Sequence, residues 1–410
     1  MSREATKWTR REFLIAGGAT LAGIALAEGA KGGTTSMNKT RKIRIGVVGG
    51  NFGTQFYWNE HRNCIVQAVS DLRPERRQRL QEVYKCDKAY ESLEMLILDK
   101  DIEAVAVFTG APDHVRHCIA ALKAGKHVIC AVPAALTIDE AEELLETVQK
   151  TGLTYMMAET SYYRQGGISA RQFHQQGKFG EIFYAEAEYH HAGLEELFFE
   201  NGKPTWRHGL PPMLYPTHCT SFLVGTTGER LTEVSCLGWG DDSDLLKGNP
   251  YRNPFWNETA MFQTNQSHPF RVSVFWKGAH RGCERAQWYG DRMSFFLEHP
   301  NGLGPVIVRS ANRIEIDDGG FERQASAFEQ YKQPNWWQTS MLPEPMRHDS
   351  GHGGSHTFIA HEFIDALVNE RKPAVDIYEA LAYTVPGIVG HKSALRDGER
   401  MKIPVYSPKG

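Results

Sequence analysis

Three short stretches of this sequence combine residue types that can bind an anion or move a proton. The first is the glycine turn Gly49-Gly50-Asn51-Phe52-Gly53, which follows an apolar, β-branched run. Glycine permits positive φ and lets a phosphate approach without meeting a Cβ, and a helix after the turn would point free N–H groups at the anion. Asp71 stands where the hydroxyls of an adenosine ribose would be bound. The pattern predicts a dinucleotide site; because G-G-x-x-G is one residue short of G-x-G-x-x-G, a plain structural turn is the alternative.

The second stretch contains Tyr215 and His218, and the third contains His352. A tyrosine three residues before a histidine can supply a base if the histidine lowers the pKa of the tyrosine or relays its proton. Both residues follow Pro211-Pro212 in a segment expected at a domain junction. His352 lies among glycines, where the backbone can approach a ligand closely. These three residues are the catalytic candidates; a tyrosine and histidine satisfied inside a helix are the alternative for the pair.

Other side chains are candidates for substrate contacts. Tyr163 and Arg164 follow the sixth predicted strand directly, and open α/β sheets place ligand contacts at the carboxyl ends of their strands. His190 ends a later strand, where a solvated surface histidine is the alternative. Trp206, with Arg207 beside it, could stack on a ligand or simply cover a sheet face.

No metal site is predicted. His348, His352 and His356 are spaced by four, but this spacing needs a helix, and the glycines around His352 argue against one. The seven cysteines include no C-x-x-C pair, so neither a zinc ribbon nor a disulfide framework is indicated.

Short apolar runs alternate with helical patterns up to about residue 160. Apolar runs at 103–109, 126–132 and 153–158 read as strands, and 74–84, 111–124 and the segment that Thr137 caps read as helices. This alternation predicts an α/β fold with a doubly wound parallel sheet of the Rossmann type. We assign this dinucleotide-binding domain to residues 37–160.

The rhythm changes beyond residue 180. Runs at 182–190, 271–276 and 292–297 alternate in the manner of half-exposed strands, and 357–368 and 377–395 are helical again. We predict an α+β substrate-binding domain over residues 161–410, built on a large open antiparallel sheet, with its last helices packing back on the first domain. An open sheet face with apolar alternation favours a homo-oligomer formed through that face.

Composition limits the classes of function. The 410 residues are 41% hydrophobic and 23% charged, which is the composition of a globular protein. A formal net charge of -3 gives no electrostatic reason to expect nucleic acid or an anionic membrane as a partner. A small-molecule substrate fits better.

The first 36 residues read as a twin-arginine export signal and a linker. Arg10-Arg11 precede an uncharged run from 15 to 27, which is shorter than the roughly 20 apolar residues that a membrane span needs. A disordered basic terminus is the alternative. The signal predicts a periplasmic or secreted protein that folds before export, commonly around a cofactor.

Several motifs together resemble the Gfo/Idh/MocA oxidoreductases. They are the glycine turn, the turn from Thr109 to His114, the segment leading into Val132-Pro133, the strand after Gly180, and Phe363-Ile364-Asp365-Ala366-Leu367. The resemblance implies a nicotinamide-binding Rossmann domain in which Thr109, His114, Val132 and Pro133 join the glycine turn at the cofactor. It also implies a sugar-like substrate between the two domains.

Two departures shift the expected reaction. Family dehydrogenases carry Glu-Lys-Pro where this chain has Ala131-Val132-Pro133, and an acid four residues before the catalytic histidine where it has Leu214. Val132-Pro133-Ala134-Ala135, Tyr215-x-x-His218 and Gly351-His352-Gly353-Gly354 are instead similar to NAD-dependent α-N-acetylgalactosaminidases, a glycosidase branch of the family. That branch implies hydride abstraction, elimination of the glycosidic substituent, addition of water and return of the hydride.

Two other functions remain open at this point. One is a sugar oxidoreductase with a tightly retained cofactor, because an exported protein meets no pool of free NAD. The other is a non-catalytic dinucleotide-binding protein. Asp71 favours NAD, since its carboxylate would repel a 2′-phosphate, while Arg73, Arg76 and Arg77 leave NADP as the less favoured cofactor.

Overall fold

The computed structural model describes residues 41–408 except 192, 281 and 300, and all structural statements below concern these residues. The expected export signal, over residues 1–36, therefore lies outside the described residues, and so does the start of the predicted first domain. Among the helices that the structure describes, none is both long enough and apolar enough to cross a membrane.

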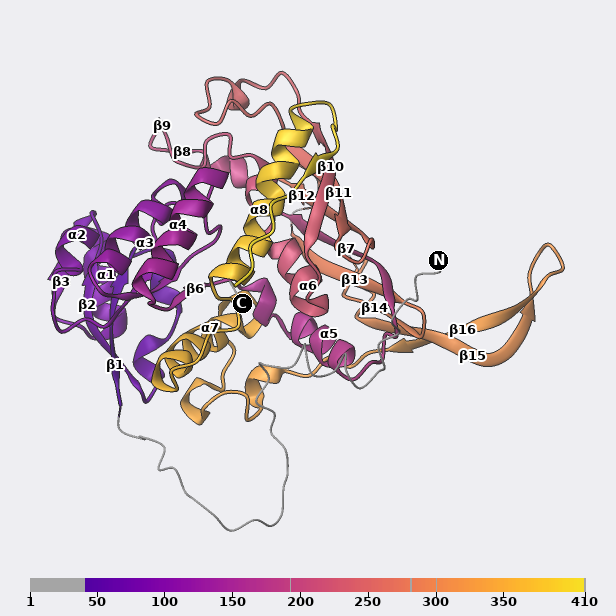
Figure 1. Cartoon of the computed structure of the whole chain (residues 1–410), viewed down its shortest axis with the longest axis horizontal. Helices are drawn as coiled ribbons and strands as arrows, with labels where there is room; N and C mark the ends of the chain where they lie inside the picture. The colour runs from indigo at the N-terminus through magenta and orange to yellow at the C-terminus, as the bar shows by residue number, and fades with distance from the viewer. Residues whose placement is uncertain (1–40, 192, 281, 300, 409–410) are drawn as a thin grey trace, which may run out of the picture. The chain divides into compact units, whose positions relative to one another are not determined.

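The first part of the chain forms a parallel sheet of six strands in the order β3-β2-β1-β4-β5-β6 (Figure 1). Its central strand β1 has Ile45 and Val47 fully buried, as a parallel sheet covered on both faces requires. The sheet ends at β6, while the predicted domain boundary near residue 160 stays a prediction. The strands are β1 (Ile43–Val48), β2 (Cys64–Ser70), β3 (Ala89–Tyr90), β4 (Ala104–Val107), β5 (His127–Cys130) and β6 (Tyr155–Met157).

Helices connect these strands and are bounded by ordinary start and stop signals. Thr137 caps α4 in a reciprocal arrangement with Glu140, and Gly152 ends that helix in the left-handed region. The apolar face of α3 is buried, and His114 stands at the start of this helix. The helices of this part are α1 (Pro74–Tyr84), α2 (Leu93–Leu96), α3 (His114–Lys123) and α4 (Ile138–Thr151).

The second sheet has nine strands in the order β16-β15-β14-β13-β7-β12-β11-β10-β17. The predicted sheet is thus present, but it is mixed, because β12 pairs in parallel with β7 while the other ladders are antiparallel. The strands are β7 (Ile182–His190), β10 (Leu231–Trp239), β11 (Asn257–Thr264), β12 (Pro269–Phe275), β13 (Cys283–Gly290), β14 (Met293–Phe296), β15 (Val306–Ile316), β16 (Glu322–Gln330) and β17 (Met401–Lys402), with a separate small ladder of β8 (Phe199–Glu200) and β9 (Lys203–Pro204).

Helices cover one face of this sheet, as Figure 1 shows for α6 and α8. α6 packs on β7 and β13, and α8 packs on β10 and also on α4 of the first part. The predicted return of the last helices toward the parallel sheet is therefore seen in the contacts of α8. The helices here are α5 (Gln165–Gln175), α6 (Thr217–Thr227), α7 (Gly351–Val368) and α8 (Ile377–Ala394).

Helix α7 begins irregularly. His352, Gly353 and Gly354 take left-handed backbone angles, so the regular helix starts only after them. A non-glycine residue rarely adopts positive φ, and His352 does so at +53°. The glycines that made a helix through His348, His352 and His356 unfavourable are thus among the residues that turn the chain at this point.

Candidate active site

A cavity of about 530 Å³ runs from the carboxyl ends of the parallel strands to the helix-covered face of the nine-stranded sheet. Open parallel sheets bind ligands at this edge. The predicted residues that line it are Gly49, Asn51, Phe52, Asp71, Thr109, His114, Val132, Trp206, Arg207, Tyr215, His218 and His352. Predicted residues from both halves of the chain therefore share one cavity.

The glycine turn after β1 is shaped by backbone packing. Gly49 has φ of +103°, and a Cβ there would come within 2.2 Å of the Phe108 carbonyl oxygen. A Cβ on Gly50 would meet the Arg76 carbonyl oxygen at 2.3 Å. Gly50 and Gly53 do not line the cavity. Gly49 and Gly50 therefore permit close contact with neighbouring backbone. The sequence pattern predicted instead that the glycines allow the close approach of a phosphate.

The prediction of a helix directly after the glycine turn is wrong. Two short 3-10 turns, Phe52–Gln55 and Trp58–Glu60, fill the connection between β1 and β2. A turn of four residues offers little of the aligned dipole that a longer helix directs at an anion.

Asp71 lies at the end of β2, where the sequence pattern predicts it. One carboxylate oxygen accepts the Gly50 N–H at 2.6 Å, and the other accepts the Arg73 N–H at 2.8 Å. Each oxygen retains acceptor capacity for ribose hydroxyls. Arg73 and Arg76 both pair with Glu200, so their charge is already engaged.

His114 braces the turns that face the cavity. Its ring nitrogens lie 2.8 Å from the Pro133 carbonyl oxygen and 3.1 Å from the Thr109 carbonyl oxygen. Burial lowers the pKa of His114, so the neutral ring carries one proton and donates to one of these carbonyls. Pro133 itself does not line the cavity and follows a cis peptide bond after Val132. His114 thus positions the Thr109 and Val132 turns.

A buried ion pair marks the other end of the cavity. His218, on α6, has its Nδ1 atom 2.9 Å from a carboxylate oxygen of Glu159 and 2.9 Å from the Ser161 hydroxyl oxygen. Burial acts to lower the pKa of His218, but the negative charge of Glu159 outweighs it and the pKa is raised. Burial acts to raise the pKa of Glu159, but the His218 charge and hydrogen bonds lower it. The pair therefore favours an imidazolium whose Nε2 is left for a ligand.

A second acid extends this network. The Ser161 hydroxyl donates to Glu284 at 2.5 Å, and the other Glu284 carboxylate oxygen accepts from Arg164 at 2.5 Å. Arg164 does not line the cavity. The Arg164 guanidinium is held by Glu284, and the expected substrate contact by Arg164 stays a prediction.

Tyr215 faces the cavity beside His218, with 5.2 Å between the ring centroids. Burial raises the pKa of Tyr215 to about 12, and the charge that acts to lower it is that of Arg207. Of the two alternatives, a tyrosine pKa lowered by His218 is not seen, because burial raises that pKa; a proton relay through His218 stays a prediction. The Tyr215 hydroxyl is a hydrogen-bond donor at neutral pH.

His352 can accept a proton. His356 Nδ1 lies 2.9 Å from the Gln55 carbonyl oxygen and must donate to it, so His356 Nε2 is an acceptor. His352 Nδ1 lies 2.8 Å from that nitrogen and therefore carries the proton of its own ring. Burial, and then the His218 charge, lower the pKa of His352 to about 4. Its Nε2 atom is thus unprotonated at neutral pH.

Arg207 brings a positive charge into the cavity. Its guanidinium stacks on the Trp206 ring at 4.1 Å, and no carboxylate in the described part of the chain forms an ion pair with it. Burial lowers the pKa of Arg207, and the nearby hydroxyls of Tyr215, Tyr189 and Tyr251 act in the opposite direction. This side chain is available to donate to ligand oxygens.

Two further predicted contacts lie elsewhere. Tyr163 is buried, stacks on Phe358 at 6.0 Å and does not line the cavity. His190 points to the other face of the sheet and stacks on Phe275, while its neighbour His191 lines the cavity. Neither of the two residues expected to contact substrate lines this cavity; strand alternation puts the adjacent histidines 190 and 191 on opposite faces.

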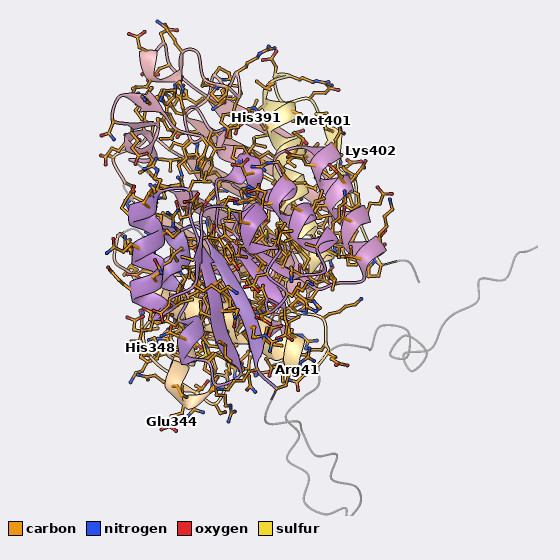
Figure 2. The ribbon with its side chains drawn as sticks, turned by 90° about the vertical axis from the view of Figure 1, so that its left-hand side faces the viewer. Arg41, Glu344, His348, His391, Met401 and Lys402 are labelled. Atoms are coloured by element: carbon orange, nitrogen blue, oxygen red, sulfur yellow. The ribbon has the colours of Figure 1, made fainter. Side chains whose placement is uncertain are left out.

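His348, His352 and His356, which are spaced by four, do not come together as one group in the described part of the chain. His348 lies at the lower left of the ribbon in Figure 2. Its Nε2 atom is 2.6 Å from a carboxylate oxygen of Glu60. His352 and His356 contact each other instead. Different partners therefore hold the members of the series.

Sequence reasoning missed Glu159, Ser161, Tyr189 and Glu284. Glu159 and Ser161 follow β6 directly, so the rule that strand ends carry ligand contacts would have found them. Glu284 is the register partner of Tyr189 across β13 and β7. This pairing of strands distant in the sequence has no local signal.

Comparison with known proteins finds a family match for an early segment of the chain and another for a late segment. Residues 43–159 match the family described as "Oxidoreductase family, NAD-binding Rossmann fold" (GFO_IDH_MocA), and residues 300–409 match "Glycosyl hydrolase 109, C-terminal domain". A glycosyl hydrolase family 109 protein of Solibacter usitatus is 25% identical over 340 residues, covering 78% of this chain and 74% of the relative. One from Stenotrophomonas maltophilia is 23% identical over 453 residues, covering 97% and 95%.

Solved structures share the fold. A levoglucosan dehydrogenase in complex with NADH and levoglucosan superposes with a TM-score of 0.71 at 17% identity, covering 89% of this chain and 100% of that one. The apo scyllo-inositol dehydrogenase of Lactobacillus casei gives 0.62 at 14% identity, covering 88% and 98%. At such identities the likeness concerns the fold alone.

Proposed function

The chain belongs to the Gfo/Idh/MocA oxidoreductase family, and we propose that it is an NAD-dependent enzyme that hydrolyses glycosides without net oxidation. The observation that carries the proposal is the make-up of the cavity. Ala131 and Val132 line it where dehydrogenases of the family are expected to carry a lysine, while Tyr215, His218 and His352 line its far end. Proton donors and an acceptor are present, but the dehydrogenase base is not among the described residues of the cavity.

The described residues fit a dinucleotide. Asp71 offers oriented carboxylate oxygens at one end of the cavity, and Gly49, Asn51 and Phe52 follow along the strand ends. NAD, when bound, would accept a hydride from a ring carbon of the substrate and later return it. Because Glu200 already engages Arg73 and Arg76, a 2′-phosphate would have to compete for them, which supports NAD over NADP.

The side chains at the far end divide the proton chemistry. The His218 imidazolium and the neutral Tyr215 hydroxyl are donors that can stabilise negative charge on a substrate oxygen. His352 is the proton acceptor. The free electron pair of its Nε2 atom would take a proton that leaves the substrate. Arg207 would orient the sugar through its hydroxyl oxygens. These roles are proposals that rest on the hydrogen-bond chain and the charges described above.

In the proposed reaction water replaces the leaving alcohol, and the other groups lost are returned. A hydride leaves the carbon that is oxidised, a proton leaves its hydroxyl oxygen and another leaves the adjacent carbon, and the glycosidic oxygen departs with a proton as an alcohol. Water then adds to the double bond, and the hydride and a proton return. One water is consumed, and the cofactor ends in its starting state.

The first test identifies the cofactor and the reaction together. Purified protein would be denatured and the released dinucleotide identified, and intact enzyme would be assayed on aryl α- and β-glycosides whose ring hydroxyls are free. We expect NAD to be released and the aryl alcohol to be set free with no accumulation of NADH.

The Tyr215→Phe variant separates catalysis from binding. It should retain NAD and lose activity by about 100-fold or more, because a positioned proton donor contributes on that order. Tyr184→Phe is the matched control, since Tyr184 bonds to Glu186 outside the cavity. A keto-sugar product formed from a donor and acceptor pair would instead identify a sugar oxidoreductase. Full activity in Tyr215→Phe would contradict the assigned role.

A further inference from the structure

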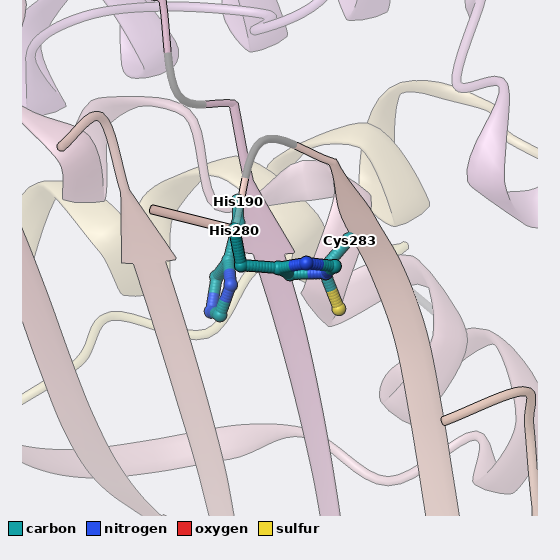
Figure 3. A group of neighbouring side chains, drawn as sticks. All are labelled: His190, His280 and Cys283. Carbon is teal, nitrogen blue, oxygen red and sulfur yellow. The ribbon is translucent and has the colours of Figure 1, made fainter. Parts of the chain in front are cut away.

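Two histidines and a cysteine converge at the end of β7, on the face of the nine-stranded sheet opposite the cavity. The ligand atoms of His190, His280 and Cys283 all lie within 4.8 Å of one another (Figure 3). His280 and Cys283 are three residues apart in the chain, and His190 comes from the end of an earlier strand. The cluster is separate from the candidate active site, since none of the three residues lines the cavity.

Strand pairing fixes two of the three residues. His190 is the last residue of β7 and Cys283 the first of β13, and the two are direct partners in the antiparallel ladder. Directly opposed residues project from the same face of a sheet, with their Cβ atoms about 5 Å apart. His280 lies on the connection from β12 to β13, which returns over the strand ends (Figure 3).

The His190 ring is held in place but lacks a polar partner. It stacks on Phe275 with centroids 4.5 Å apart and an interplanar angle of 16°. Its Nε2 atom is buried and has no hydrogen-bond partner among the described residues. A buried polar atom without a protein partner costs free energy unless a water molecule or an ion satisfies it. Bonding to a metal ion would satisfy this nitrogen.

The ligand types point to one class of metal. Two imidazoles and a thiolate suit Zn²⁺ and other borderline transition ions, whereas Mg²⁺ and Ca²⁺ require oxygen ligands. In a tetrahedral Zn²⁺ site with these atoms, bond lengths of about 2.0–2.3 Å put the ligands about 3.3–3.6 Å apart. The cluster therefore needs to contract by about 1.2–1.5 Å from its 4.8 Å limit, and His280, which is exposed, can supply this movement.

Nearby charges do not oppose a cation. Glu188 and Glu186 lie one and two pleats before His190 on the same face, and they pair with Arg271 and Arg285. The four charges balance, and the Glu188 carboxylate is already engaged by both arginines. A fourth ligand would therefore be water, which reaches the site from the side of His280.

We propose that His190, His280 and Cys283 bind one Zn²⁺ ion in a tetrahedral site completed by water. The ion would tie the β12–β13 connection to the end of β7. The next residue after β7, His191, lines the cavity on the other face, so the ion would also brace the strand end that presents it. This inference is independent of the proposed reaction.

Cobalt substitution tests the site directly. Tag-free protein would be stripped with a chelator and titrated with Co²⁺, whose spectrum reports both geometry and sulfur ligation. We expect one Co²⁺ per chain, the visible bands of a tetrahedral ion, and an ultraviolet charge-transfer band from a thiolate. Zn²⁺ should displace the cobalt and abolish the spectrum.

Variants assign the ligands. Cys283→Ser should abolish the charge-transfer band, and His280→Ala, at an exposed position that tolerates substitution, should weaken Co²⁺ binding by about 10–100-fold. His299→Ala is the control, because His299 is exposed and outside the cluster. Wild-type protein that binds no Co²⁺, or binding that survives unchanged in His280→Ala, would overturn the proposal.

Discussion

The buried pair of Glu159 and His218 sets the charge at the end of the cavity that Tyr215 and His218 line. Glu159 is fully buried, and one of its carboxylate oxygens lies 2.9 Å from His218 Nδ1. Removing one partner of a buried pair leaves an uncompensated charge, which costs about 3–5 kcal/mol. The pH dependence of the free energy of unfolding therefore reports directly on this pair.

The Glu159→Gln variant should lose stability most strongly between about pH 4.5 and pH 6.5. The raised pKa of His218 stabilises the fold below the unfolded value of about 6.5, and this contribution fades as the pH rises through the folded value. The lowered pKa of Glu159 stabilises the fold above about 4.5, and this contribution fades as the pH falls through the folded value. Urea unfolding of both proteins across pH 4 to 9 measures the difference; a constant difference over that range would show that the pair is not ionised.

The pH profile of catalysis should be bounded by two histidines. His352 must be neutral to accept a proton, and its pKa is lowered to about 4. His218 must be protonated to donate, and its pKa is raised. We therefore expect kcat/KM to fall below about pH 4 and again at a pH above the ordinary histidine value of about 6.5. An acid limb at pH 6 to 7 would indicate that a histidine of ordinary pKa, and not His352, is the acceptor.

At the scale of elements, no regular helix follows the turn after β1 directly. The turn is held by close backbone contacts instead. Gly49 holds positive φ, and a Cβ at this position would lie 2.2 Å from the Phe108 carbonyl oxygen, which is too close for any side chain. Binding of the dinucleotide must then depend on individual N–H groups and on Asp71, rather than on a helix dipole.

Gly49→Ala should therefore destabilise the fold by at least about 1–3 kcal/mol, the usual cost of a strained backbone, and should reduce the NAD retained after purification. Chemical denaturation and analysis of the released cofactor measure the two effects. Gly125→Ala is the control, because it also has positive φ but meets nothing within 4 Å. Equal losses in the two variants would mean that backbone angle alone, without the Phe108 contact, sets the cost.

The sequence predicted what local patterns encode. The alternation of strands and helices, the cap at Thr137, and strand 182–190 all follow from periodicity and capping residues, and each is present. The absence of a regular helix directly after β1 was not predicted, because the glycine pattern resembles turns that precede a full helix. Glu284 was missed because β13 reaches Tyr189 only through sheet register. His190 was named as a substrate contact, but a pair of adjacent histidines at a strand end does not show which of the two faces the cavity, and it is His191 that does so.

At the scale of the whole molecule, the proposal makes the dinucleotide a resident catalyst. If residues 1–36 direct export, as we propose, the protein works where no free NAD exists to exchange. Returning the hydride to the same sugar would keep the cofactor in its starting state. Association of two copies through the open sheet face stays a proposal; Leu237, Trp239 and Met261 are exposed apolar side chains on β10 and β11.

Solvent deuterium incorporation tests the central claim most directly. The enzyme would cleave an aryl glycoside in D₂O, and the sugar product would be analysed by NMR and mass spectrometry, with product incubated alone with enzyme as the control for later exchange. Oxidation followed by elimination predicts deuterium on the carbon next to the transiently oxidised one. Cleavage that leaves this carbon fully protonated would contradict the account.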